Sequence, residues 1–140
     1  MKTPLQIRPV QRADLESIAA IQAAAPEASQ WPPSDYLLYE TRVALAGRQI
    51  IGFAAYRTLA PGEHEILNLA VSPSWRRRGV ARALVGSLCS GAAGAWFLEV
   101  RESNRAARKL YEAMDFTETG VRLSYYENPS ESGIVMRFHS

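Results

Sequence analysis

Apolar residues recur along the chain with two different periods, and these periods predict its helices and strands. Helical spacing of three to four residues follows Asp14, begins again at Val80 and ends at Gly91, and returns after Ser103 or Asn104. A shorter helical stretch follows residue 34, a serine, which is favourable at a helix N-terminus. Strand-like runs, rich in bulky apolar residues and bounded by turn residues, lie at 5–9, 42–46, 49–56, 66–71, 95–100, 117–124 and 134–138.

The order of these elements predicts the architecture. A strand, two helices, three strands, a helix, a strand, a helix and two strands imply an α/β (α+β) fold, with a mixed sheet and helices on both faces. Gly47 and Arg48 suit a two-residue hairpin turn, and the mostly apolar run 66–71 is typical of a central strand. The length of 140 residues suits one domain, which we expect to span residues 1–140.

Composition and charge narrow the possible functions. Hydrophobic residues make up 47% and charged residues 21% of the chain, as in an ordinary globular protein. The net charge of +2 is too small to argue for nucleic acid, yet arginines cluster in 76–82 and again at Arg101, Arg105 and Arg108. This clustering favours a local anion. No apolar run has the length of a signal peptide or a bilayer span, so we expect no membrane partner.

Cysteine and histidine usage point to a reducing compartment and to no metal. The single cysteine, Cys89, excludes an internal disulfide bond, so a cytoplasmic protein is expected. Its position on the core-facing side of the helix after Gly79 favours a packed thiol over a nucleophile. His64 and His139 are isolated, and residues 63–65 are interpreted as a polar turn before a strand. The sequence therefore predicts no metal site.

The hexapeptide Arg76-Arg77-Arg78-Gly79-Val80-Ala81 lies between the predicted strand 66–71 and the helix that follows it. The first N–H groups of a helix lack intrahelical partners and carry about half a positive charge. A glycine at this point lets an anion approach the backbone. The loop therefore predicts a phosphate site, with solvated arginines at a surface helix as the alternative. It is neither a dinucleotide fingerprint nor a P-loop, because Gly-x-Gly-x-x-Gly and Gly-Lys-Ser/Thr are absent.

Two motifs resemble one known family. Arg-x-x-Gly-x-Ala is similar to the pyrophosphate loop of the GCN5-related N-acetyltransferases (the GNAT superfamily), which reads Gln/Arg-x-x-Gly-x-Gly/Ala. The superfamily's next strand and helix resemble Leu98-Glu99-Val100-Arg101-Glu102-Ser103-Asn104, followed by Ala107, Leu110-Tyr111 and Phe116. More narrowly, this stretch and Asn68-Leu69-Ala70-Val71-Ser72-Pro73 resemble the RimI-type ribosomal-protein alanine N-acetyltransferases. The resemblance covers residues 66–127 and implies a GNAT-like domain: a mostly antiparallel, twisted sheet of about seven strands with about four helices.

The resemblance implies acetyl-CoA as the cosubstrate and indicates which residues hold it. The diphosphate is expected at the arginine loop, and the thioester carbonyl at the N–H groups of Leu69 and Val71 if that strand splays from its neighbour. Asn104 is expected to contact coenzyme A, although an N-cap alone would also explain it. The expected contacts are Leu69, Ala70, Val71, Arg76, Arg77, Arg78, Gly79, Val80, Ala81, Arg82 and Asn104.

Two residues carry the chemistry that the resemblance implies. Glu99 lies in a strand of otherwise apolar residues, where burial would raise the pKa of its carboxyl toward a range useful for a base. A glutamate that points to solvent at a strand end is the alternative. The family pattern makes Glu99 the base, acting directly or through water, and Tyr111 the general acid for the departing thiolate. A buried tyrosine ring would also suit a core.

The acceptor is expected to be a primary amine. The pKa is about 7.8 for an α-amino group and about 10.4 for a lysine side chain. At about pH 7.5, roughly a third of the α-amino groups and about a thousandth of the lysines are therefore uncharged. This favours a protein N-terminus, of the alanine type in the related family, over a lysine or a small amine. The acceptor groove is expected between Trp31 and the pair Tyr125 and Tyr126, although half-exposed strand-end aromatics would also explain the pair.

Some residues depart from the family pattern. Ala81 replaces the commoner second glycine, and Trp31 precedes two prolines where the family has Pro-Trp-Ser. Asp115 stands where glycine is usual, which requires it to adopt the left-handed conformation after a helix. The leading hypothesis is an acetyl-CoA-dependent N-terminal protein acetyltransferase, as a monomer or weak homodimer. A non-catalytic acyl-CoA-binding module and a nucleic-acid-binding domain are the alternatives from other classes.

Overall fold

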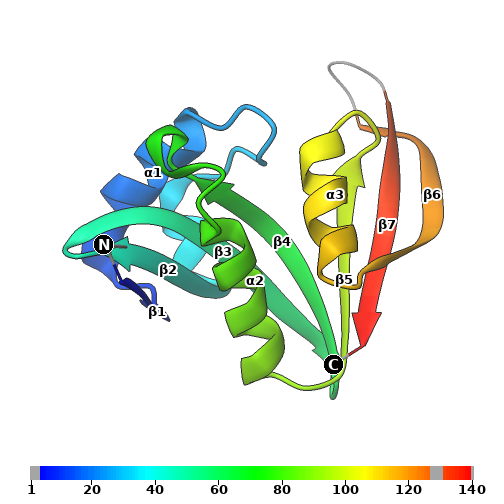
Figure 1. Cartoon of the computed structure of the whole chain (residues 1–140), viewed down its shortest axis with the longest axis horizontal. Helices are drawn as coiled ribbons and strands as arrows, with labels where there is room; N and C mark the ends of the chain where they lie inside the picture. Colours follow the sequence, from blue (N-terminus) through cyan, green and yellow to red (C-terminus); the bar gives the residue numbers. More distant parts are fainter. Residues whose placement is uncertain (1–3, 127–130, 140) are drawn as a thin grey trace.

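A seven-stranded sheet runs through the whole molecule (Figure 1). The computed structural model describes residues 4–126 and 131–139, apart from the side chains of residues 124 and 125. The strands lie in the order β1-β2-β3-β4-β5-β7-β6, and all neighbours are antiparallel except β4 and β5. They are β1 (Leu5–Pro9), β2 (Glu40–Ala46), β3 (Gln49–Ala60), β4 (Glu63–Val71), β5 (Ala95–Arg101), β6 (Thr117–Tyr126) and β7 (Glu131–His139). The predicted mixed, mostly antiparallel sheet is confirmed.

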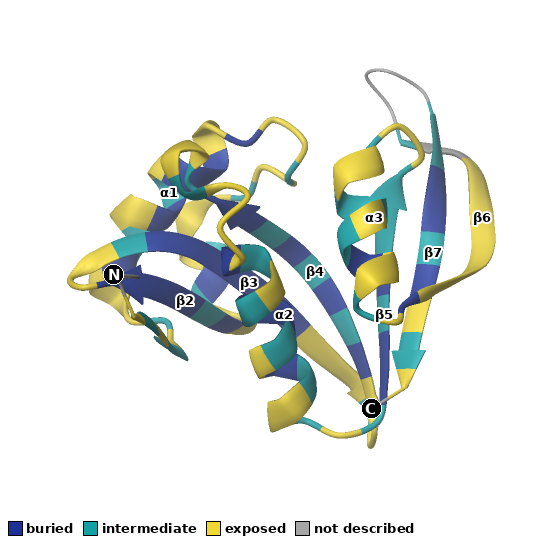
Figure 2. Cartoon of the chain, in the orientation of Figure 1, coloured by how far each residue is buried: buried dark blue, intermediate teal, exposed yellow. Residues whose placement is uncertain are grey.

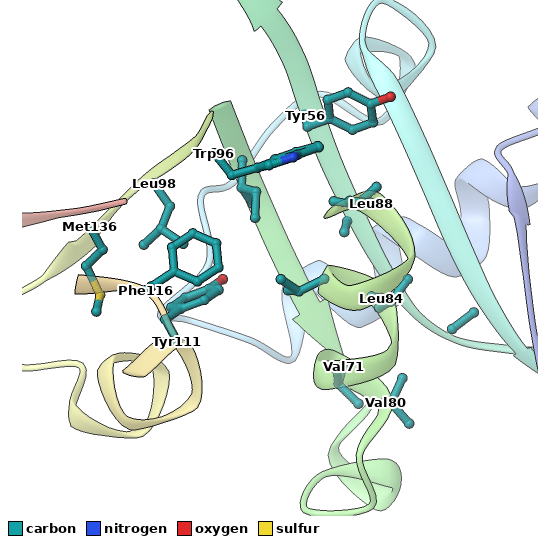
Figure 3. Close-up of a cluster of buried hydrophobic side chains, with 14 of the residues drawn as sticks. Tyr56, Val71, Val80, Leu84, Leu88, Trp96, Leu98, Tyr111, Phe116 and Met136 are labelled. Atoms are coloured by element: carbon teal, nitrogen blue, oxygen red, sulfur yellow. The ribbon is translucent and has the colours of Figure 1, made fainter. Parts of the chain in front are cut away.

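Helices cover both faces of the sheet, as predicted. The α-helices are α1 (Leu15–Ala23), α2 (Val80–Gly91) and α3 (Arg105–Ala113), and the short 3-10 helices are η1 (Arg12–Asp14), η2 (Pro33–Leu37) and η3 (Pro73–Trp75). The first α-helix, α1, packs on one face of the sheet, whereas α2 and α3 share the core on the other face. Figure 3 shows this shared core, and Figure 2 marks the buried residues in dark blue. Of the helices in the described part, none is long and apolar enough to cross a bilayer.

One predicted helix is shorter than expected. The stretch after residue 34 forms the 3-10 helix η2 instead of an α-helix, so the described residues contain three α-helices where about four were predicted. The reason is a lack of room, because two prolines fix the start of η2 and β2 already begins at Glu40. The aromatic ring of Tyr36 in η2 is nevertheless fully buried in the core between α1 and the sheet.

Asp14 and Asn104, which directly precede α1 and α3, behave differently. Asn104 precedes α3 and its side chain accepts a hydrogen bond from the Ala107 N–H at 3.2 Å, which is a true N-cap. Asp14 precedes α1, but its carboxylate binds the Arg8 guanidinium at 2.7 and 3.0 Å and the Gln11 N–H at 2.7 Å. The guanidinium holds the pKa of Asp14 below its usual range. Asp14 therefore ties β1 to the start of α1.

The strand β4 begins three residues earlier than predicted. Residues 63–65, interpreted as a polar turn, pair with both β3 and β5. His64 is buried there: its Nδ1 accepts from the Thr58 hydroxyl at 2.9 Å, and its Nε2 donates to the Ala93 carbonyl at 3.1 Å. The prediction was wrong because the two flanking glutamates hide the strand signal, while the histidine between them finds internal partners.

A bulge in β4 changes the face toward which its side chains point. Ile66 and Asn68 pair with consecutive residues of β3, so Leu67 between them is an extra residue. Since side chains alternate along a strand, one extra residue shifts the alternation. Ile66 consequently lies in the core under α2 and α3, whereas Ala70 lies in the core under α1. Asn68 shares the α1 side, where it bonds to the loop after α1.

The sheet divides between β4 and β5. These parallel strands pair only over residues 63–65 and 95–97, and beyond that point they diverge, as Figure 1 shows. Further along, β5 continues to pair with β7 as far as Arg101, while β4 stays paired with β3 as far as Val71. The inner edges of β4 and β5 therefore carry backbone groups without ladder partners. This divergence is the splay on which the predicted carbonyl site depends.

Candidate active site

A cleft of about 200 Å³ lies where β4 and β5 diverge. The cleft has two walls. The strand–helix wall comes from β5 and α3, and the loop wall is the segment 26–29 that follows α1. The predicted site residues that line it are Leu69, Glu99, Asn104, Tyr111 and Tyr126. Residues that lie far apart in the sequence thus line the same cleft.

The floor of the cleft presents backbone donors. The Ser72 N–H donates to the Ile51 carbonyl of β3 at 2.7 Å. Successive N–H groups of a strand point to opposite edges, so those of Val71 and Leu69 point away from β3, toward the gap. The Leu69 N–H also lies 3.1 Å from the Asn68 Oδ1. Both N–H groups thus face the gap, but the Leu69 N–H is shared with the Asn68 side chain, so their role as donors to a carbonyl stays a prediction.

Glu99 lies in the cleft and is largely buried, which contradicts the alternative of a solvent-pointing glutamate. Its side chain is 17% exposed, and its Oε1 has no hydrogen-bond partner among the residues that the structure describes. That oxygen forms a salt bridge with Arg122 of β6, whose Nε lies 3.5 Å from it. The carboxylate packs against Gly133 of β7, where an added Cβ would lie 3.0 Å from it.

Burial sets the electrostatics of Glu99. Desolvation raises the pKa of its carboxyl, Arg122 opposes this rise, and Glu65 of β4 adds to it. The carboxylate therefore binds a proton more readily than a carboxylate in water. A buried acceptor with an unused lone pair and a raised pKa suits a group that takes a proton during a reaction.

Tyr111 lies on the inner side of α3, with 4% of its surface exposed. Its ring packs edge-on against Phe116 at 5.3 Å, and Figure 3 shows the hydroxyl turned away from Met136, toward β4. Burial raises the pKa of the phenol, so it stays protonated at neutral pH. The ring belongs to the core and the residue also lines the cleft, so its role as general acid stays a prediction.

Two residues near Tyr111, Asp115 and Cys89, have the conformation and the environment that their place in the sequence predicts. Asp115 adopts φ +69° after α3, the left-handed conformation that the missing glycine requires, and the Phe116 N–H then donates to the Tyr111 carbonyl at 2.9 Å. Cys89 of α2 is half-buried, and burial raises the pKa of its thiol to about 11. It is a packed thiol, as predicted.

The arginine loop opens α2 with exposed backbone. Gly79 is the N-cap residue with φ +81°, and no side chain caps the first turn of the helix. An added Cβ at Gly79 would meet no atom within 4 Å, so the space beside these N–H groups is open. Arg77 and Arg82 are exposed near this point, and the Arg78 guanidinium lies 5.1 Å from the Trp75 ring. The arrangement fits an anion at the helix start.

Arg76 has a different position from the other cations of the loop. Its Nε donates to the Val71 carbonyl at 3.3 Å, and its Nη2 donates to the Ala24 carbonyl at 3.1 Å. Nη2 also lies 3.6 Å from the Glu27 carboxylate. The guanidinium thus spans from β4 to the end of α1, so its expected contact with a diphosphate stays a prediction.

The predicted acceptor residues are only partly brought together. Tyr126 lines the cleft, with the Arg101 guanidinium 4.5 Å from its ring, whereas the side chain of Tyr125 lies outside the described residues. Trp31 stacks on Tyr36 at 4.8 Å and is not among the described residues that line the cleft. Segment 26–29 takes that place instead. Sequence reasoning missed this segment and Asn68, although a lone amide in an apolar strand was a usable signal.

Comparisons with known proteins decide the family. The family model for the acetyltransferase (GNAT) family matches residues 8–116. The chain belongs to this family. It is 30% identical over 145 residues to N-alpha-acetyltransferase RimI of Mycobacterium tuberculosis, covering 96% of this chain and 92% of that protein. It is also 39% identical over 100 residues to the ribosomal protein bS18-alanine N-acetyltransferase of Haemophilus influenzae, covering 66% of each chain.

A solved structure of a GNAT protein agrees with this assignment. The ribosomal-protein-S18-alanine N-acetyltransferase of Escherichia coli superposes with a TM-score of 0.83 at 27% identity, covering 97% of this chain and 94% of that one. The chain spans 92% of the length of the Mycobacterium tuberculosis RimI and 66% of the Haemophilus influenzae protein. It spans only 26% of the length of another curated relative. The resemblance to the RimI-type members of the GNAT family is confirmed.

The described residues of this GNAT chain fit acetyl-CoA in two respects and an acceptor amine in a third. The open helix start at Gly79 suits a diphosphate, and the unpaired edge of β4 suits the thioester carbonyl. The buried oxygen of Glu99 without a hydrogen-bond partner suits an amine or a water in the cleft. Elsewhere, no group of three His, Cys, Asp or Glu side chains in the described part is placed to hold a metal ion.

Proposed function

We propose that this chain transfers the acetyl group of acetyl-CoA to the N-terminal α-amine, of the alanine type, of a ribosomal or other protein. The observation that carries the proposal is the buried, raised-pKa carboxylate of Glu99 in the cleft beside the unpaired edge of β4. The amine nitrogen attacks the thioester carbon directly, forming the N–C bond, and the C–S bond then breaks.

The N–H groups of Leu69 and Val71 stabilise the negative charge that develops on the carbonyl oxygen. The helix start at Gly79 and the cations of the loop hold the diphosphate and so fix the thioester in the cleft. Asn104 caps α3 and contacts coenzyme A from the strand–helix wall. Binding and orientation thus come from the backbone, and the proton transfers come from two side chains.

Glu99 takes the proton that the amine loses, directly or through one water. Tyr111 donates its phenolic proton toward the sulfur as the C–S bond breaks, and solvent restores that proton. The pKa of a phenol already lies above that of a thiol, and burial raises it further, so transfer to a fully formed thiolate would run uphill. Tyr111 therefore gives its proton to the sulfur in concert with the breaking of the C–S bond, before a free thiolate forms.

The choice of acceptor rests on two supports. An α-amine is free at neutral pH far more often than a lysine, so one modestly basic carboxylate suffices to activate it. The relatives named above act, by their names, on a ribosomal protein alanine or on protein α-amines. A ribosomal acceptor would place the reaction in the cytoplasm.

The experiment compares three acceptors at equal concentration with acetyl-CoA, with thiol release and product mass as readouts. The first is a peptide that begins with a free alanine, the second is the same peptide with a blocked N-terminus and one lysine, and the third is a small diamine. We expect thiol release with the first and little with the others. Faster turnover of the lysine peptide or the diamine would overturn the acceptor class, and no release with any amine would overturn the enzyme.

A further inference from the structure

The loop wall of the cleft has no regular secondary structure of its own. Residues 26–29 follow α1, and two backbone bonds shape this turn, from the Ala25 N–H to the Gln22 carbonyl and from the Ala28 N–H to the Ala25 carbonyl, both at 3.0 Å. The Gln30 Nε2 closes the turn by donating to the carbonyls of Gln22, Ala25 and Ala28 at 3.0, 3.2 and 3.2 Å. The wall lies across the cleft from the strand–helix wall that carries Glu99 and Tyr111. Its position therefore depends on the side chains that hold it from outside.

Asn68 of β4 holds the end of this wall. Its Oδ1 accepts from the Ser29 N–H at 3.1 Å, and its Nδ2 donates to the Ser29 carbonyl at 2.9 Å, so both backbone groups of one residue are bound. The same Oδ1 accepts from the Leu69 N–H, and the same Nδ2 donates to the Tyr36 hydroxyl at 2.9 Å. Every hydrogen-bonding site of the carboxamide is used, which fixes its orientation.

A second layer of buried polar groups supports Asn68. The Tyr36 hydroxyl donates to the Gln22 Oε1, and the Gln22 Nε2 donates to the Trp31 carbonyl at 2.9 Å. Asn68, Tyr36 and Gln22 are each at least 94% buried. In such surroundings, a hydrogen bond that is lost leaves its partner without water to replace it. The network thus connects β4 to the loop at two points, Ser29 and Trp31.

The other end of the wall is held by a cation of the arginine loop. Arg76 donates to the Ala24 carbonyl and lies near Glu27, which itself lines the cleft. Both clamps, Asn68 and Arg76, come from the segment of chain that carries the carbonyl donors and the start of the phosphate loop. Besides the Gln30 bonds within the turn, the loop wall is therefore held relative to β4 by two side chains, of which Asn68 itself lines the cleft.

We propose that Asn68 is a positioning residue: through Ser29 it sets the distance between the loop wall and Glu99, and thereby the affinity for the acceptor amine. The inference rests on the proposed function, because it concerns the acceptor of that reaction. A reacting amine held by a wall that has moved by about 1 Å loses much of the benefit of orientation. The affinity for acetyl-CoA should change little, because its diphosphate is held at the Gly79 helix start, although the Asn68 Oδ1 also accepts from the Leu69 N–H.

The test uses a matched pair of hydroxyl deletions. Tyr36→Phe removes a hydroxyl that bonds Asn68 and keeps the ring that stacks on Trp31. Thr58→Val removes a hydroxyl that bonds His64. Like Asn68, His64 is a buried polar residue of β4, but it lies at the end of the strand remote from the cleft. Asn68→Ala is the full deletion. Each variant is assayed for the KM of the alanine peptide, the KM of acetyl-CoA and the melting temperature.

We expect the KM of the peptide to rise about tenfold in Asn68→Ala and several-fold in Tyr36→Phe, with the KM of acetyl-CoA unchanged. Thr58→Val should lower the melting temperature like Tyr36→Phe but leave both KM values unchanged. Hydrogen exchange should accelerate at the amides of residues 28 and 29 in Asn68→Ala and not in Thr58→Val. This exchange arm reports on the wall even if a variant loses turnover.

Two results would overturn the inference: equal rises of both KM values, or unchanged exchange at the wall in Asn68→Ala. A third result would overturn it as well: if the peptide KM rose as much in Thr58→Val as in Tyr36→Phe, general destabilisation would explain the effect. Failure of the proposed function looks different, because the wild-type chain itself would then release no thiol with any amine. The two failures are therefore distinguishable in the same assays.

Discussion

The two walls of the cleft differ in how the chain builds them. The strand–helix wall is one continuous stretch, in which Glu99, Asn104 and Tyr111 lie within thirteen residues on a strand, a turn and a capped helix. The loop wall is assembled from a distance, because its two ends, Ser29 and Ala24, are held by Asn68 and Arg76, which lie 39 and 52 residues further along the chain. The difference shows that the reacting groups are local in sequence, whereas the place for the acceptor depends on long-range contacts.

The largest expected effect comes from breaking the strand–helix wall at its base. In Glu99→Gln the amide can no longer take a proton, so kcat should fall by about 10²–10⁴-fold while the dissociation constant of acetyl-CoA stays unchanged. Stopped-flow or coupled thiol assays measure the first and equilibrium binding the second. Glu102→Gln, the same change at an exposed position three residues away, is the control. Full turnover in Glu99→Gln would show that Glu99 is not the base.

A smaller loss is expected from Tyr111→Phe, which sharpens the comparison when it is set beside Tyr36→Phe. Both changes remove one buried hydroxyl and keep a packed ring. The variant at Tyr111 should lower kcat by about 10²-fold with little change of either KM, since it removes a donor to the departing sulfur. The variant at Tyr36 should raise the peptide KM with kcat nearly unchanged. Identical kinetic profiles would show that the walls do not have separate roles.

A third prediction concerns the phosphate loop at the start of α2. Gly79 has φ +81° and Gly47, in the β2–β3 turn, has φ +60°, and an added Cβ would meet no atom at either. Alanine at either position should destabilise the fold by about 1–2 kcal/mol through backbone strain alone. Only Gly79→Ala should raise the KM of acetyl-CoA, because its Cβ intrudes on the diphosphate. An equal acetyl-CoA KM in both variants, by initial-rate kinetics, would place the diphosphate elsewhere.

The smallest effect is a shift of a pH profile. Burial raises the pKa of Glu99 and Arg122 lowers it, so the carboxylate form needed as base is lost as the pH falls through that raised pKa. Arg122→Gln removes the opposing charge and should move the acid limb of kcat/KM to higher pH. The acceptor's own titration is common to both proteins and cancels in the comparison. Arg137→Gln, whose cation lies over Phe97, should leave the limb in place.

Most of the fold follows from local patterns. Helical and strand periods placed the seven strands and the three α-helices, the Gly47 turn and the Asn104 cap, because each depends on residues within a few positions of one another. The errors occurred where distant partners decide the outcome. Residues 63–65 look like a turn until His64 meets Ala93 and Thr58, and the stretch after residue 34 looks like an α-helix until β2 leaves it no room.

The site divides in the same way. The arginine loop with Gly79 and the motif with Glu99 and Tyr111 are legible in the sequence, since a helix start and a strand–turn–helix are defined by adjacent residues. The sequence cannot show that Arg76 reaches the end of α1 or that Glu99 packs on Gly133 beside Arg122. Nor does it show the bulge at Leu67 that turns Asn68 toward the loop wall.

By itself, therefore, the sequence determined the family, the order of the elements and the chemical groups of the strand–helix wall. The tertiary structure alone decided where β4 and β5 separate, which residues form the opposite wall and what surrounds the base. The physical reason is range. Propensity, capping and motif chemistry act between neighbours along the chain, whereas strand register, burial and the raised pKa of Glu99 arise only when distant segments pack together.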